Sequence, residues 1–378
     1  MVKKSRSLAT EPSNNQMIYF SIVVPTFNRP DEVEELLKSV EQQVYRDFEI
    51  IFVDGSPTDV LHPVINKYKS PSMSLEEDVD ELTSPSESPE RGSDDKYLNI
   101  QYFHEKKLKA SPSRNYGVNK ANGKYIVFVD SDCILPSQFL QQIYDFIQSK
   151  GGEIDAYGGP DAAHPSFTVT QKAINYAMTS RLTTGGIRGK KKHIGQYQLR
   201  GFNMGMKKTV FDDLNGFSEM EVGEDIDLSM RLWEKGYTAH LIDKAFVYHK
   251  RRVSLSKFRK QLFMHGKGRI DLYKRHKSAL KFVHLIPSIF VLALVVGFVL
   301  ALLNNTFLYL FTFGVAFHLL LLFLDATFLN KSIKVGFASA IAAYVMLISY
   351  GCGLMYNYVK RIIFGSNKES DKSVELKN

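Results

Sequence analysis

The stretch KYIVFVDSDCILP, residues 124–136, places two aspartates directly after an apolar run. Residues 125–129 carry no charged side chain, which is typical of a strand buried on both faces of a sheet. Asp130 and Asp132 follow where this strand ends. In a parallel α/β sheet, ligands collect beyond the carboxyl ends of the strands. The stretch therefore predicts a ligand-binding edge with two carboxylates.

The segments around this stretch repeat a pattern of strand, turn and helix. Continuous apolar runs predict buried strands at 18–25, 48–54, 97–103 and 124–130. Apolar residues at helical spacing predict helices at 30–43, 111–123 and 223–237. Strands that alternate with helices pair in parallel, so we expect an α/β fold with a mostly parallel sheet. Asp54 ends the second strand and should open into the same crevice as Asp130.

Two uncharged apolar runs lie near the end of the sequence, at 282–324 and 335–359. Each can cross a bilayer, since about 20 apolar residues span the hydrocarbon core. The first run is twice that length and breaks at Asn304-Asn305, as a hairpin of two spans would. The alternative is a buried core helix, for which this run is too long. We expect about three transmembrane helices over 282–360, at 283–303, 306–328 and 335–359.

The two ends of the chain give conflicting indications of membrane topology. Residues 1–16 are basic and Ser-rich without an apolar stretch, so we expect no secretory signal and a catalytic part in the cytosol. Three spans would then put the 361–378 tail outside. The cations near that end favour a cytosolic tail: Lys360, Arg361, Lys368, Lys372 and Lys377. The sequence leaves this conflict open within an expected integral membrane protein of the plasma or inner membrane.

Charge is concentrated in two segments. Thirteen Lys and Arg but one acid, Asp271, lie between Lys244 and Lys281. The juxtamembrane segment 250–281 suits anionic lipid, which explains its charge at less cost than nucleic-acid binding; we expect no nucleic-acid partner. Residues 70–95 hold nine acids, seven serines and three prolines, so we expect a disordered acidic insertion. The two cysteines, Cys133 and Cys352, indicate neither a disulfide framework nor a thiolate metal site.

The acids near two predicted elements suggest a metal and a base. Asp130 and Asp132 can approach one hard cation from the same edge, although an Asp-Ser turn is the ordinary alternative. Glu224, Asp225 and Asp227 stand at the start of a predicted helix. Helix capping explains one such acid more readily than three. Asp225 could therefore point into the crevice as a general base.

Five segments, in order, then become recognisable: SIVVPTFNRPDEVEELLKSV, VDGSPTD, SRNYGVNKANGKYIVFVDSD, RGFNMGMKKTVFDDLNGFSE and GEDIDLSMRLWEKGY. Together they resemble the family-2 glycosyltransferases with a GT-A fold, over about residues 18–249. The resemblance implies inverting transfer of a single sugar from a nucleotide-diphosphate sugar. The acceptor would be a hydroxyl of a lipid-linked or cell-envelope glycan, and the cofactor a divalent metal, Mn2+ or Mg2+.

The resemblance also implies roles for individual residues. It places Pro25, Thr26 and Asn28 in the nucleotide pocket, with Asp54 at the base and Arg114 near the diphosphate. Asp132 would bind the metal, and Asp130 would lie beside the ribose and the metal. Gly201 and Asn203 would border donor and acceptor, Glu224 and Asp225 would form the acidic pair, and Asp225 would be the catalytic base. His249 would join the metal or phosphate site, although a lone histidine at a strand end is as often structural.

Two departures and two rival functions bear on this interpretation. Asp54-Gly55 stands where many relatives have two adjacent aspartates, and QLFMHGKGR lacks the Arg-Trp pair of processive synthases. The second departure favours transfer of single sugars. A nucleotidyltransferase would need a Gly-rich basic loop, which VVPTFNRPDE lacks. A non-catalytic nucleotide-sugar-binding membrane protein would not need the full set of acids. The expected catalytic domain is 17–249, between the disordered basic tail at 1–16 and the juxtamembrane segment.

Overall fold

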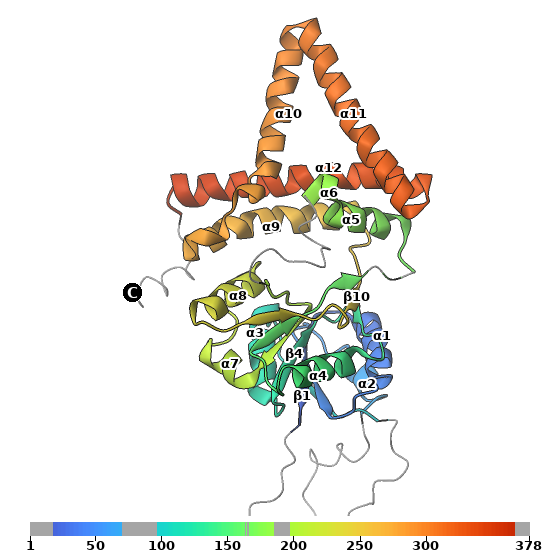
Figure 1. Cartoon of the computed structure of the whole chain (residues 1–378), viewed down its shortest axis with the longest axis vertical. Helices are drawn as coiled ribbons and strands as arrows, with labels where there is room; N and C mark the ends of the chain where they lie inside the picture. Colours follow the sequence, from blue (N-terminus) through green and yellow to red (C-terminus); the bar gives the residue numbers. More distant parts are fainter. Residues whose placement is uncertain (1–17, 70–96, 163, 165, 185–196, 367–378) are drawn as a thin grey trace, which may run out of the picture.

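The structure is a computed structural model of the whole chain, in which residues 18–69, 97–162, 164, 166–184 and 197–366 are described (Figure 1). The predicted tail at 1–16 and the predicted insertion at 70–95 lie outside the described residues. Of the 361–378 tail, the described part ends at residue 366.

A seven-stranded sheet forms the centre of the lower part in Figure 1, in the order β3-β2-β1-β4-β8-β6-β9. Its parallel half contains β3 (Ile100–His104), β2 (Phe48–Asp54), β1 (Phe20–Thr26) and β4 (Tyr125–Val129). The other half contains β8 (Asn203–Lys207), β6 (Ala156–Gly158) and β9 (Ala239–Leu241); β8 is antiparallel to its neighbours β4 and β6, and β6 is parallel to β9. The predicted α/β class with a mostly parallel sheet is confirmed.

Helices cover both faces of this sheet because its central strands are apolar on both sides. Every residue of β1 and β2 is buried. One face packs against α1 (Pro30–Glu41), α2 (His62–Ile65) and α4 (Phe139–Ser149). The other face packs against α3 (Ala110–Lys120), α7 (Lys208–Asp213) and α8 (Glu224–Glu234). The carboxyl ends of β1 and β4 are thereby left as the open edge of the domain.

A small second sheet lies at that edge. It consists of β5 (Cys133–Ile134), β10 (Val247–His249) and β7 (Asp161–Ala162), in the order β5-β10-β7. The antiparallel pairing of β10 with β5 aligns His249 with Cys133. This register brings a residue from the end of the sheet domain next to the aspartates that follow β4.

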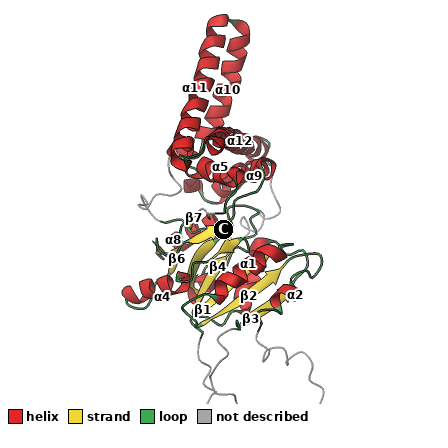
Figure 2. Ribbon diagram, turned by 90° about the vertical axis from the view of Figure 1, so that its right-hand side faces the viewer, coloured by secondary structure: helices red, strands yellow, loops and turns green. Residues whose placement is uncertain are grey.

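A layer of helices covers the same end of the domain (Figures 1 and 2). This helical layer contains α5 (Val169–Thr179), α6 (Arg181–Thr184), α9 (Leu255–Arg275) and α12 (Ile333–Tyr358), with short 3-10 turns at Lys277–Ala279 and Phe282–His284 and a π turn at Val359–Ile363. The hairpin, α10 (Ile286–Leu303) and α11 (Asn305–Asn330), rises steeply away from it. The structure thus has the three expected apolar helices, each long enough to cross a membrane.

Glycines allow the helices of the layer to approach closely. A Cβ atom on Gly266 of α9 would lie 2.2 Å from the carbonyl oxygen of Tyr350, and one on Gly353 of α12 would lie 2.1 Å from that of Phe263. In the juxtamembrane segment, α9 is amphipathic, and its Phe258 is fully buried against α12 and α5. One difference from the expected domain division concerns α5. Although it lies within 17–249, its apolar side chains, such as Ile174, pack in the helical layer.

Candidate active site

A cavity of about 1250 Å³ lies between the sheet domain and the helical layer. On the domain side, its walls include Pro25 and Thr26 at the end of β1, Asp130 and Asp132 after β4, and Asp225 at the start of α8. On the helical side they include Met346, Leu347 and Tyr350 of α12 and Ile286 and Pro287 of α10. Acids from two distant parts of the chain therefore share one cavity with apolar side chains of the layer.

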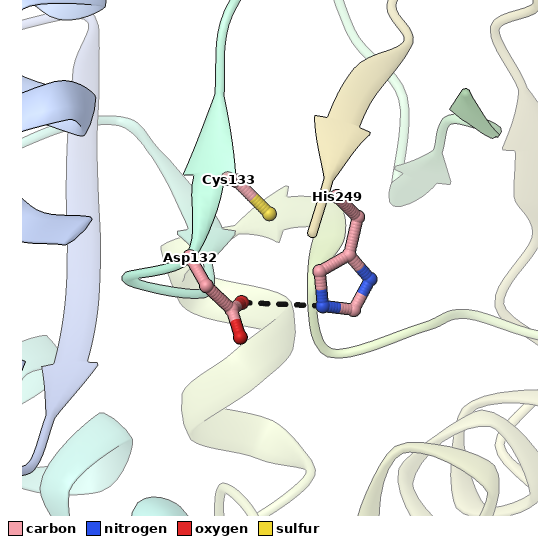
Figure 3. Close-up of side chains that lie close together, drawn as sticks. All are labelled: Asp132, Cys133 and His249. Carbon is pink, nitrogen blue, oxygen red and sulfur yellow. Dashed lines mark ion pairs between the residues drawn. The ribbon is translucent and has the colours of Figure 1, made fainter. Parts of the chain in front are cut away.

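Asp132 meets two cationic or potentially cationic side chains. Its Oδ1 atom lies 3.2 Å from Nε2 of His249 (Figure 3), and its Oδ2 atom pairs with the guanidinium of Arg29. Burial alone would raise the pKa of Asp132, but the contacts with His249 and Arg29 hold it well below its ordinary value. The carboxylate is therefore ionised and available to a cation.

The donor atoms around Asp132 fit a hard divalent cation. Ligand atoms of Asp132, Cys133 and His249 lie within 4.8 Å of one another. Oδ1 of Asp132 is buried and faces Nε2 of His249 at 3.2 Å, so a carboxylate oxygen and an imidazole nitrogen point toward the same space. Burial raises the pKa of Cys133 well above its ordinary value, so this residue stays a thiol and is a poor ligand for Mn2+ or Mg2+. Asp132 and His249 are the residues that fit the metal.

Arg114 joins the two groups of acids. Its Nη2 atom lies 2.7 Å from Asp130 and its Nη1 atom 3.0 Å from Glu224, while its side chain is 4% exposed. Asp130 is thus engaged by Arg114 and is not in the group around Asp132. Burial and the charge of Asp225 raise the pKa of Glu224, whereas Arg114 opposes that shift. This buried ion pair fixes the start of α8 against the end of β4.

Asp225 is held at the mouth of α8 by backbone groups. Its Oδ2 atom accepts a hydrogen bond from the N–H of Gly201 at 3.2 Å, and its Oδ1 atom accepts one from Ile226 at 2.8 Å. Gly223, the N-cap of α8, has φ of 90°, a left-handed conformation that favours glycine. Gly201 lies against the guanidinium of Arg114, where a Cβ atom would come within 3.0 Å of Nη2. These glycines let Asp225 face the cavity.

Three of the expected nucleotide-binding residues do not line this cavity. Asp54 is fully buried and accepts hydrogen bonds from the N–H and hydroxyl of Ser56 and from Tyr102. Asn203 is also buried, and its amide donates to the carbonyl oxygens of Pro160 and Ala245. Asn28 has a left-handed backbone, with its N–H donating to Oγ of Ser56. In this structure the side chains of Asp54 and Asn203 and the backbone of Asn28 hold loops around the cavity in place.

Arg29 was not identified from the sequence, although it contacts Asp132. It lies in the quoted segment TFNRPD, immediately before the helix that begins at Pro30. Because Pro30 fixes where α1 starts, the preceding residue is held at the open edge of the sheet. This position could have identified Arg29 from the sequence. A cation at a strand-to-helix turn that faces two predicted acids is a candidate partner for them.

The order of the sheet and the position of its acids define the GT-A architecture of glycosyltransferases. The model of "Glycosyl transferase family 2" matches residues 21–214, and that of "Glycosyl transferase family group 2" matches residues 125–356. The chain therefore belongs to glycosyl transferase family 2.

Relatives agree with this assignment, and a solved structure shares the fold. The succinoglycan biosynthesis protein ExoA of Rhizobium meliloti is 21% identical over 68% of this chain and 71% of its own. A GalNAc(5)-diNAcBac-PP-undecaprenol beta-1,3-glucosyltransferase of Campylobacter jejuni is 31% identical over 30% of this chain and 29% of its own. The mannosyltransferase PcManGT of Pyrobaculum calidifontis, solved with GDP-Man and Mn2+, shares the fold at a TM-score of 0.57 and 16% identity, covering 89% of this chain and 87% of that one.

Several relatives are much longer than the matching region. The chain spans only 12–17% of the length of three uncharacterized Rickettsia glycosyltransferases that it matches at 30–33% identity. The common part in those proteins is a stretch of 112–128 residues.

Proposed function

We propose that the protein transfers a single sugar, with inversion, from a nucleotide-diphosphate sugar to a hydroxyl of a lipid-linked or cell-envelope glycan. The observation that carries this proposal is the shared cavity of Asp132, His249 and Asp225. The names of the relatives support it, since one acts in succinoglycan biosynthesis and another on a PP-undecaprenol-linked glycan. PcManGT, with the same fold, binds GDP-Man with Mn2+.

Asp132 and His249 would hold the divalent cation. When bound, a Mn2+ or Mg2+ ion supplies positive charge that stabilises the departing diphosphate. Arg29 now pairs with Asp132 and lines the same cavity. It would turn to the diphosphate, because a guanidinium matches phosphate oxygens in geometry as well as charge. Arg114 stays in place between Asp130 and Glu224 and keeps the acids aligned.

Asp225 would act as the general base. It removes a proton from the acceptor hydroxyl as the oxygen attacks the anomeric carbon on the face opposite the diphosphate. The N–H of Gly201 orients the carboxylate for this step. One displacement inverts the configuration of the sugar.

Replacement of the base provides the direct test. In Asp225→Asn, sugar transfer should fall by about 100-fold or more, the usual contribution of a positioned base. Affinity for the nucleotide sugar should remain close to normal. Asp145→Asn is the matched control, because Asp145 is exposed on α4 and accepts a hydrogen bond from its neighbour Gln141. Ordinary turnover by Asp225→Asn would refute the assignment.

A panel of nucleotide sugars distinguishes the rival functions. Purified protein with Mn2+ should hydrolyse or transfer sugar from one member of the panel and release the nucleoside diphosphate. A nucleotidyltransferase would instead release pyrophosphate from a nucleoside triphosphate. A non-catalytic binding protein would bind a donor without turnover.

The hairpin gives the proposed membrane anchor. Only 11% of the apolar window of α10 and 6% of that of α11 are buried, and both helices carry large exposed hydrophobic side chains. Such a surface is suited to lipid and not to water. The cations of α9 lie at the base of the hairpin, which favours a cytosolic catalytic domain. We expect membrane lipid and glycan acceptors as partners, and no nucleic acid.

A further inference from the structure

Two cationic side chains and a histidine line the cavity next to the start of α10. They are Arg269 of α9 and Lys281 and His284 of the linker before α10. The backbone N–H of Lys281 donates a hydrogen bond to Nδ1 of His284 at 3.0 Å. The other ring nitrogen, Nε2, takes no part in this hydrogen bond. Burial and the charges of Arg269 and Lys281 lower the pKa of His284 to about 3, so the three groups act on one another.

This group has no acidic partner within the part of the chain that is described. The nearby cations Arg251 and Arg275 pair with Asp161 and Asp227, respectively. No such pair exists for Arg269 or Lys281 among the described residues, and Nε of Arg269 is buried without an acceptor. A buried donor without an acceptor is costly, and together with two cations that have no acidic partner among the described residues it favours an anionic ligand.

The position of the group indicates what that ligand is. It adjoins the N-terminus of α10, an 18-residue helix whose N-cap, Leu285, provides no side-chain cap. Uncapped N–H groups at such an end attract phosphate. The same cavity continues along the apolar side chains of Ile286, Met346 and Leu347. A phosphate at Arg269 would therefore place an attached hydrocarbon chain beside the hairpin.

We propose that Arg269, Lys281 and His284 bind the phosphate of an amphiphilic acceptor, a lipid phosphate or diphosphate whose glycan head reaches Asp225. This inference rests on the proposed function and names the acceptor class. The shared chemistry is a phosphate group, which free phosphate or an ordinary phospholipid could also supply.

Binding of dodecyl phosphate to the full chain in detergent tests the site. It should bind, and Arg269→Gln and Lys281→Gln should each weaken it about tenfold, as loss of one charge-assisted hydrogen bond would. Lys281 is exposed, so its replacement does not endanger folding. Lys277→Gln is the control, because Lys277 lies over the Tyr273 ring and not on the cavity wall.

Three outcomes would overturn the proposal. Equal affinity in all variants would remove the role of these cations. Inorganic phosphate binding as tightly as dodecyl phosphate would make it a free-anion site. Full competition by phosphatidylglycerol nanodiscs would make it a site for bulk lipid. Asp225→Asn separates this result from the proposed function, because it should keep dodecyl phosphate binding while losing transfer.

A second inference follows independently from the directions of the helices. α9 carries seven Lys and Arg, so it cannot lie in hydrocarbon. α12 runs alongside it in Figure 1, while the hairpin rises steeply from both. The two helices touch where Gly353 meets Phe263, and Asn357 donates to the carbonyl oxygen of Lys267 and to Asp271. α12 must therefore share the level of α9.

The outer face of α12 is a single apolar stripe. Phe337, Ile341 and Ile348 are 66%, 41% and 38% exposed, at a spacing that keeps them on one side of a helix. At about 100° per residue, that side is opposite the one formed by Tyr350, Gly353 and Asn357, which contacts α9. Such a helix has one face for lipid and one for a charged protein layer.

We infer that α12 lies in the plane of the membrane and that only α10 and α11 cross it. Two crossings return the chain to the side from which it started. The cations Lys360 and Arg361 then lie on the same side as α9, which removes the conflict that three crossings create.

Spin labels on the full chain in bilayers test this topology. Labels at Phe337→Cys and Ile348→Cys should lie at similar depths. A crossing helix would separate eleven residues by about 16 Å, and such a difference in depth would overturn the inference. In intact cells, an impermeant maleimide should label Asn304→Cys but reach Ser366→Cys only after permeabilisation. Labelling of Ser366→Cys from outside would also refute it.

Discussion

The sheet domain and the hairpin differ in how their apolar residues are kept from water. β1 and α10 are both uncharged and mostly apolar, yet every residue of β1 is buried, whereas only 11% of the apolar window of α10 is buried. β1 is short and ends at turn residues, so helices can close over it. α10 is long and packs against α11 and α12 while much of its apolar surface stays exposed. The comparison shows that an apolar run does not by itself distinguish burial in a protein core from exposure to lipid. Its length and the residues on either side are needed to decide.

Loss of Asp132, the proposed metal ligand, should have the largest effect and should be confined to the sheet domain. Asp132→Asn should reduce transfer by about 100-fold or more, because the diphosphate loses its cation. Mn2+ binding, followed by the EPR signal of the free ion, should weaken in parallel. Asp145→Asn is again the control. Normal Mn2+ affinity in Asp132→Asn would move the metal site elsewhere.

A matched pair of isoleucines compares the two regions directly. Ile51→Ala in β2 removes a fully buried side chain and should cost about 2–5 kcal/mol of unfolding free energy. Ile289→Ala in α10 removes one that is 48% exposed and should cost less than about 1 kcal/mol in detergent. Thermal unfolding of both variants in the same micelles provides the measurement. Similar losses would mean that the hairpin packs against protein.

Substitution of one glycine in the helical layer and one in the hairpin compares how closely the helices pack in the two regions. Gly353→Ala forces a Cβ atom to within 2.1 Å of the Phe263 carbonyl oxygen and should destabilise the layer by about 1–3 kcal/mol. Gly314→Ala in α11 meets nothing within 4 Å and should be neutral or slightly stabilising. Thermal unfolding again separates them. A neutral Gly353→Ala would show that α9 and α12 are not in close contact.

The smallest effect should come from the contact between α8 and α9. The hydrogen bond to Asp227 raises the pKa of His276, although partial burial opposes this shift. The pKa of Asp227 is in turn lowered to about 2. Because the folded pKa of His276 is raised, protonated His276 stabilises the fold at low pH, and this is lost as pH rises through that pKa. NMR titration should show the raised midpoint, and Asp227→Asn should lower it. An unchanged midpoint would contradict the pairing.

Much of the sheet domain follows from the sequence. The strands at β1, β2, β3 and β4 and the helices α1, α3 and α8 were predicted within a few residues, because their apolar periodicity is strong and turn residues bound them. β6, β8 and β9 were not, since three to five residues carry too little pattern. The α12 segment was predicted to be apolar and helical. Its direction could not be, because it depends on contacts with α9.

The site was predicted less evenly. Asp130, Asp132, Glu224 and Asp225 share one cavity because strand ends and helix starts gather at the same edge. The hydrogen bonds to Asp54 come from Ser56 and Tyr102, and only the folded chain shows that both of its carboxylate oxygens are engaged. The contact of Arg29 with Asp132 likewise joins residues far apart in sequence.

The packing of α5 in the helical layer has a practical consequence. Its Tyr176 donates to Asp325 at the base of α11, and Ile174 and Ala177 sit among the side chains of α12. A truncated chain ending before residue 282 would keep α5 but lose the helices α11 and α12 that cover it. The apolar surface of α5 would then be exposed and would promote aggregation. The hairpin and α12 therefore are not a detachable anchor, and attempts to obtain a soluble catalytic fragment should begin by redesigning α5.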